Sequence, residues 1–243
     1  MATYDLEEQE QLAEIKTWWK QYGNLVTNVL TAAAVIVIAW QGWSWYQRNQ
    51  STQASMVYNV LQKAVQDKDS QRIKAASGEL LEKFSRSNYA SLGALTAAKA
   101  MIDAGEAKTA KLQLAWVAEN GKDELRDLAR LRLAAVLLDE KDYDQALKQL
   151  DGNVGPSFSA RFADNRGDIL SAQGKKAEAL AAYQAAVSAL DEANKVGKEK
   201  NLSAGWQGQS NAVYRELLQQ KLDAQGGSKE CSAVLPPLCY YWH

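Results

Sequence analysis

The side chains best suited to catalysis or metal binding are few and lie at the end of the chain. The single histidine is His243, and the two cysteines are Cys231 and Cys239. A serine–histidine–aspartate triad, a cysteine–histidine pair or a four-ligand zinc site needs more of these residues within reach of one another. The two cysteines, eight residues apart, could close a small disulfide loop in an oxidising compartment or stay free thiols. Metal binding by these cysteines with His243 is the weakest alternative.

Carboxylates are abundant, but their spacing indicates solvated helix faces. Asp123 and Glu124, Asp127, and Asp139 and Glu140 could in principle act in acid–base pairs. Carboxylates on helices more often serve solubility and i,i+4 pairing. The sequence also lacks a glycine-rich phosphate loop, GxSxG and HExxH. We therefore predict that the chain is not an enzyme and that it has no cofactor, metal or small-molecule substrate.

The composition favours an all-helical protein and excludes two other classes. The 243 residues include 28 basic and 29 acidic ones, so a clustered positive surface for nucleic acid is disfavoured. A mean hydropathy of −0.39 is too polar for a bundle of membrane helices. Only three prolines interrupt the chain, so helices can form along nearly all of it.

One segment differs from the rest and predicts a membrane-spanning helix at residues 24–46. The 27 residues between Lys20 and Arg48 carry no charge. A helix of about 20 such residues rises about 30 Å and crosses the hydrocarbon core. Aromatic side chains of the kind found where membrane lipid meets water flank it on both sides. They are Trp18, Trp19 and Tyr22 before it, and Trp40, Trp43, Trp45 and Tyr46 after it. A cleaved signal peptide and a buried core helix are the alternatives.

The arm at residues 1–23 has a helical stripe made by Leu12, Ile15, Trp19 and Tyr22. It is either an amphipathic helix that binds the membrane surface or a partner protein, or simply the water-exposed end of the membrane helix. Lysine and arginine counts on the two sides of the span are nearly equal, so the orientation does not follow from charge.

The long remainder, residues 47–225, repeats a helix–turn–helix pattern. In each unit a small residue is followed by a turn position seven residues later and by an alanine twelve residues later. These triplets are Ala98, Gly105 and Ala110; Ala134, Lys141 and Ala146; and Gly167, Gly174 and Ala179. The steps of 36 and 33 residues predict a tetratricopeptide-like domain, with Lys141 where glycine is usual. A generic helical bundle is the alternative, and both are all-α.

The flanks of these units complete the predicted domain organisation. Residues 52–85 predict two helices that form an atypical first repeat running straight on from the membrane helix. Residues 191–208 are polar and contain three glycines, which predicts a loop, and residues 209–225 predict a capping helix. Residues 226–243 show no periodicity and predict a flexible tail.

The order of these parts resembles one family. Four stretches carry the likeness: IKTWWKQYG at residues 15–23, WQGW at 40–43, YASLGAL at 89–95 and RFADNRGD at 161–168. Over about residues 5–222 the chain is similar to the YfgM family of ancillary subunits of the bacterial SecYEG translocon.

The resemblance implies a single-pass protein of the bacterial inner membrane, with its N-terminus in the cytoplasm and its repeats in the periplasm. It also implies association with SecYEG, with the chaperone PpiD and with periplasmic chaperones that receive secreted proteins. It brings no catalytic residues. A repeat scaffold for another envelope assembly, or a regulator docked through the arm, is the alternative.

Overall fold

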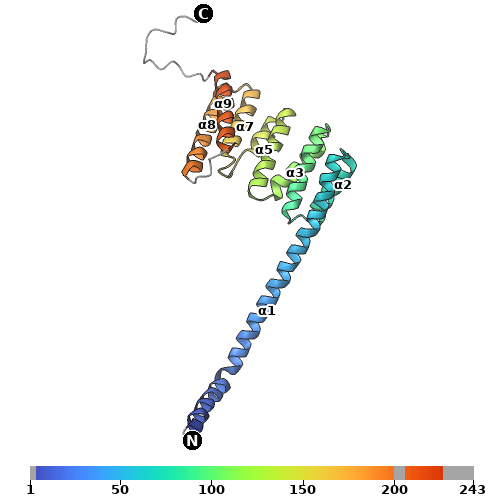
Figure 1. Ribbon diagram of the computed structural model, residues 1–243. Helices are drawn as coiled ribbons and strands as arrows, with labels where there is room; N and C mark the ends of the chain where they lie inside the picture. The colour runs from blue at the N-terminus through green and yellow to red at the C-terminus, as the bar shows by residue number, and fades with distance from the viewer. Residues whose placement is uncertain (1–3, 200–205, 227–243) are drawn as a thin grey trace, which may run out of the picture. The chain divides into compact units, whose positions relative to one another are not determined.

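The computed structural model describes residues 4–199 and 206–226, and every regular element within them is an α-helix (Figure 1). This confirms the predicted all-α fold class. The helices are α1 (Tyr4–Gln66), α2 (Ser70–Lys83), α3 (Asn88–Asp103), α4 (Ala107–Asn120), α5 (Asp123–Asp139), α6 (Tyr143–Gln149), α7 (Ser159–Ala172), α8 (Lys176–Glu199) and α9 (Trp206–Ala224).

The chain divides into two units, one ending at Met56 and the other beginning at Val57. The first unit is a stretch of α1 that contains the candidate membrane span. Its most apolar 18-residue window has a mean hydropathy of 1.7, and 6% of that window is buried within the chain. A core helix would be mostly buried, so the alternative of a core helix is wrong. Helix α1 has no end at the predicted boundaries near residues 23 and 46, which stay predictions.

The second unit is built from helices that pack on their neighbours in sequence. Helix α3 packs on α2 and α4, α5 on α4 and α6, and α8 on α7 and α9. The first helices of successive pairs also touch, α3 with α5 and α5 with α7. Contact between near neighbours is the organisation of a repeat protein. The most completely buried large side chains include Leu61, Leu80, Met101, Leu114, Ile169 and Leu218.

The turns between paired helices share one backbone geometry. The turn residue has a positive φ in each of the three units: 78° at Gly105, 63° at Lys141 and 76° at Gly174. The next residue's N–H donates to the carbonyl five residues earlier, at 2.8–2.9 Å, which is the Schellman helix ending. Lys68, with φ 54°, ends α1 in the same way. The turn therefore imposes the left-handed conformation even where the residue is lysine.

The predicted loop at residues 191–208 is wrong over most of its length. Helix α8 continues to Glu199, and α9 begins at Trp206. Contacts with α9 stabilise this extension, since Arg215 binds Asp191 at 2.9 and 3.2 Å and the Asn211 amide donates to Asn194 at 2.7 Å. The glycines of this segment weaken a helix, because each costs about 1 kcal/mol relative to alanine. The contacts with α9 can offset that cost.

Candidate binding groove

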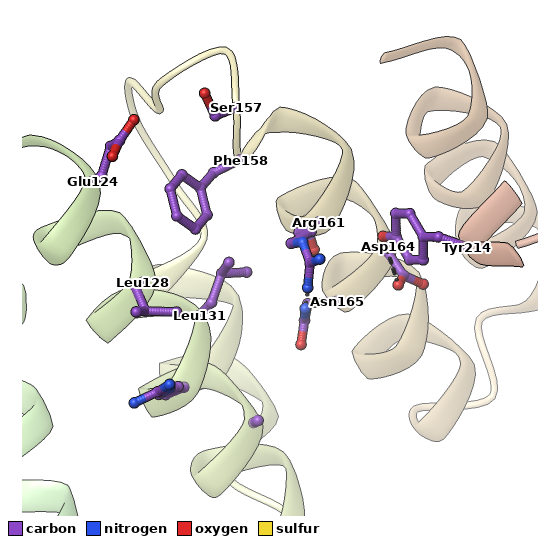
Figure 2. Close-up of a pocket in the computed structure, with 11 residues that line it drawn as sticks. Glu124, Leu128, Leu131, Ser157, Phe158, Arg161, Asp164, Asn165 and Tyr214 are labelled. Atoms are coloured by element: carbon purple, nitrogen blue, oxygen red, sulfur yellow. Dashed lines mark hydrogen bonds between the residues drawn. The ribbon is translucent and has the colours of Figure 1, made fainter. Parts of the chain in front are cut away.

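A cavity of about 630 Å³ lies between α5, α7 and α9 (Figure 2). Helix α5 contributes one side of it, α7 and the residues before it contribute the centre, and α9 contributes the other end. The lining residues are Glu124, Leu128, Leu131, Arg132, Ala135, Ser157, Phe158, Arg161, Asp164, Asn165 and Tyr214. The lining mixes apolar side chains with charged ones.

The groove residues recur at matching positions of successive repeats. Leu128 precedes Ala134 by six residues, just as Arg161 precedes Gly167. In the same way, Arg132 and Asn165 each stand two residues before that small residue. In α5 and α7 the groove is therefore lined from matching positions of the first helix of two successive repeats. The signal that could have identified these residues in the sequence is this shared register.

Apolar and polar groups occupy different parts of the groove. Figure 2 shows Phe158 close to Leu128 and Leu131, with Arg161 and Asn165 farther along α7. The Arg161 guanidinium lies 5.4 Å from the centre of the Tyr214 ring. That distance is within the range of a cation–π contact.

A buried carboxylate positions the loop that carries Phe158. Asp127 is 1% exposed and accepts hydrogen bonds from the Gly155 N–H at 2.8 Å and from Arg126 at 3.0 and 3.1 Å. Arg130 donates to the backbone carbonyls of Gln149, at 2.8 Å, and of Asp151. The interpretation of Asp127 as part of a solvated face is therefore wrong, because it is an anchor inside the domain.

A second polar network joins α9 to α7 and α8. The Lys221 ammonium binds Asp164 at 2.7 Å and Asp168 at 2.7 and 2.8 Å. The Tyr214 hydroxyl donates to Asp164 at 2.9 Å, and the Tyr183 hydroxyl donates to Asp168 at 2.8 Å. Each carboxylate thus has a cation and a neutral donor, which satisfies groups that would be costly to leave unpaired.

The environment of this network shifts several pKa values. Burial alone would lower the pKa of Lys221, but the hydrogen bonds and charges of Asp164 and Asp168 outweigh it, so the pKa is raised. Burial, followed by the hydrogen bond to Asp168, raises the pKa of the Tyr183 hydroxyl. Burial and the charge of Asp164 raise the pKa of Tyr214 in the same way. The two tyrosines therefore stay neutral and the lysine stays charged over the physiological range.

The repeat residues singled out in the sequence lie between helices and not in the groove. Five alanines have no exposed surface: Ala98, Ala110, Ala134, Ala146 and Ala179. Gly167 faces the ring of Tyr183, and a Cβ built at this glycine would lie 2.5 Å from Cε1 of that ring. Gly105 and Gly174 occupy the turns described above. These positions form the framework that holds the groove in place.

The predicted membrane anchors all lie on α1 with exposed side chains. The seven aromatic residues, Trp18, Trp19, Tyr22, Trp40, Trp43, Trp45 and Tyr46, are 44–77% exposed. The Trp18 ring contacts Trp19 and Tyr22, with centroid distances of 6.3 and 5.8 Å. A regular helix rises about 27 Å from Tyr22 to Trp40, close to the thickness of a hydrocarbon core. Cys231 and Cys239 lie outside the described residues.

The comparisons of the sequence with known proteins agree on one family. A model described as a tetratricopeptide repeat-like domain matches residues 16–227. A protein of Neisseria gonorrhoeae named ancillary SecYEG translocon subunit is 33% identical over 90% of this chain and 97% of its own. A protein of Haemophilus influenzae with the same name is 31% identical over 75% of this chain and 90% of its own.

A solved structure, MamA 41-end from Desulfovibrio magneticus RS-1, has a TM-score of 0.44 and 16% identity, over 72% of this chain and 97% of that one. That likeness is too slight to bear on function. The family and the exposed apolar helix together fit a membrane-anchored protein. Because the family model covers most of the sequence and the first relative is matched over nearly its whole length, the chain belongs to the YfgM family of ancillary SecYEG translocon subunits.

Proposed function

We propose that the protein is a non-catalytic, membrane-anchored subunit that associates with the SecYEG translocon. The observation that carries this proposal is the similarity, over nearly their whole length, to proteins that bear that name. The helical architecture supports it, because an exposed apolar helix long enough to cross a membrane precedes a repeat domain that offers a binding groove.

The proposed mechanism is a tether. The span holds the repeat domain close to the translocon, and tethering of this kind raises the effective concentration of weak binding sites, up to about millimolar for short linkers. Ala54, Leu61 and Ala64 lie on the same continuous helix α1 and are completely buried. Helix α1 therefore contains both the candidate span and buried residues of the repeat domain.

We further propose that the N-terminus lies in the cytoplasm and the repeats in the periplasm of a bacterial inner membrane. There the groove would meet chains that emerge from the translocon and pass them to PpiD and other periplasmic chaperones. Binding through side chains of a repeat face requires neither a cofactor nor covalent chemistry.

Affinity isolation of the full-length protein from its own membrane in a mild detergent tests the association. We expect SecYEG to be recovered with it, and recovery to survive the double substitution Trp18→Ala and Trp19→Ala, which leaves the charge-free span intact. Absence of SecYEG from both isolations contradicts the proposal. If partners are recovered with the unaltered protein and every one of them is lost in the double variant, the result supports a regulator docked through the arm.

A further inference from the structure

The groove contains two arginines without an anionic partner. Among the described residues, neither Arg132 nor Arg161 forms an ion pair or donates a guanidinium hydrogen bond, whereas the nearby Arg126 and Arg130 bind Asp127 and the adjacent loop. Among the described residues, Asp164 forms no ion pair with Arg161 and instead accepts from Lys221 and from the Tyr214 hydroxyl. An uncommitted guanidinium beside apolar surface is a suitable receptor for a carboxylate.

Two further features define what else the groove can accept. Phe158, Leu128 and Leu131 form its apolar part, and both arginines are among the residues that line the same groove. The Asn165 amide nitrogen donates to the Arg161 carbonyl at 3.0 Å, which leaves the amide oxygen available to accept from a backbone N–H. A cavity of about 630 Å³ lies in the range that encloses a small ligand or a few side chains, not a folded domain.

We propose that this groove binds an extended polypeptide segment in which an apolar side chain and a carboxylate stand two residues apart, so that both lie on the same face of the segment. The apolar side chain packs on Phe158 and the two leucines, and the carboxylate pairs with a guanidinium group of the groove, that of Arg132 or of Arg161. Glu124, at the apolar end of the groove, disfavours a second acid on that side. The inference rests on the proposed function and names the class of segment that the repeat domain receives.

Four peptides with the same glycine–serine flanks test the inference on full-length protein in detergent micelles. Their central pairs, each separated by one glycine so that both side chains lie on the same face, are leucine–aspartate, leucine–asparagine, leucine–lysine and serine–aspartate, and binding is followed by fluorescence anisotropy. We expect the leucine–aspartate peptide to bind about fivefold more tightly than the leucine–asparagine peptide, as for an exposed charge pair worth about 1 kcal/mol. We expect the leucine–lysine and serine–aspartate peptides to bind more weakly still.

Matched variants locate the effect. The double variant Arg132→Gln and Arg161→Gln should abolish the preference for aspartate over asparagine, whereas Arg72→Gln, at an exposed arginine paired with Asp67, should keep it. Glu124→Gln should leave the leucine–aspartate peptide bound at least as tightly. Equal binding of all four peptides, tighter binding of the lysine peptide, or a preference unchanged in the double variant overturns the inference.

Co-isolation of SecYEG separates this inference from the proposed function. The double variant should still recover SecYEG, because the candidate span is unaltered. If no peptide binds while SecYEG is recovered, the inference fails and the translocon association stands. If neither is found, both fail.

Discussion

Replacing Gly167 by alanine should destabilise the domain, although alanine is the better helix former. The new Cβ would lie 2.5 and 2.6 Å from two carbons of the Tyr183 ring, closer than such atoms approach in proteins. That ring is 3% exposed and its hydroxyl is bonded to Asp168 at 2.8 Å, so it has little freedom to move. Either the ring or the spacing of α7 and α8 must change.

Two opposed effects set the magnitude. Overpacking of a core costs about 1–3 kcal/mol, while alanine gains about 1 kcal/mol over glycine inside a helix. Because contacts of 2.5 and 2.6 Å are severe, the overpacking cost lies in the upper part of that range, about 2–3 kcal/mol, and we expect a net loss of about 1–2 kcal/mol in the free energy of unfolding. For a domain of this size, that lowers the midpoint of thermal unfolding by about 2–8 °C.

A second helical glycine is the matched control. Gly78, within α2, has no atom within 4 Å of where its Cβ would be. Gly78→Ala should therefore stabilise the protein by about 0.4–1 kcal/mol. The assay is thermal unfolding of the full-length protein in detergent, followed by circular dichroism at 222 nm. In a Tyr183→Leu background, Gly167→Ala should become neutral or stabilising. A Gly167→Ala protein as stable as wild type, or an equal effect of both glycine changes, would refute the reasoning.

Three further outcomes follow from the polar networks. Lys221→Met should lower the free energy of unfolding by about 1–3 kcal/mol in denaturant titrations, which is less than for a fully buried pair because a quarter of the lysine side chain is exposed. The control Lys195→Met, in an exposed ion pair, should change it by less than about 0.5 kcal/mol. Because the pKa values of Lys221, Tyr183 and Tyr214 are raised, the stability that this network contributes should be constant from neutral pH to about pH 10 and fall as the pH rises further, and a midpoint that rises there would contradict this. Asp127→Asn should speed hydrogen exchange at the loop amide that it binds, and unchanged exchange would show that the carboxylate does not fix the loop.

The helices and their turns could be predicted because they depend on local chemistry and a repeated register. A small residue followed by a turn residue seven positions later marks a close helix contact and a left-handed ending, both of which are visible in sequence. Lys141 shows that register is the stronger signal, since the structure gives it φ 63° without glycine's freedom. The local hydrogen bond from the Asp142 N–H to the Leu137 carbonyl closes that turn with lysine in place of glycine.

The groove and the end of the array could not be predicted as readily. Arg132 and Arg161 are surface residues, so no pattern of burial marks them before successive helices are aligned. Asp127 is an ordinary helical carboxylate in the sequence, and only the returning loop at Gly155 makes it a buried anchor. The helical part of residues 191–208 depends on bonds from α9, which lies later in the chain.

Photo-crosslinking in intact cells is the most direct test of the central claim that the span places the repeat domain at the translocon. A photoreactive amino acid is placed at Val35 in the candidate span and, in a second variant, at Leu128 in the groove, and the adducts are identified by mass spectrometry. The account predicts SecYEG adducts from position 35 and adducts with secreted chains or periplasmic chaperones from position 128. Cytoplasmic adducts from position 128, with no translocon component from position 35, would contradict it.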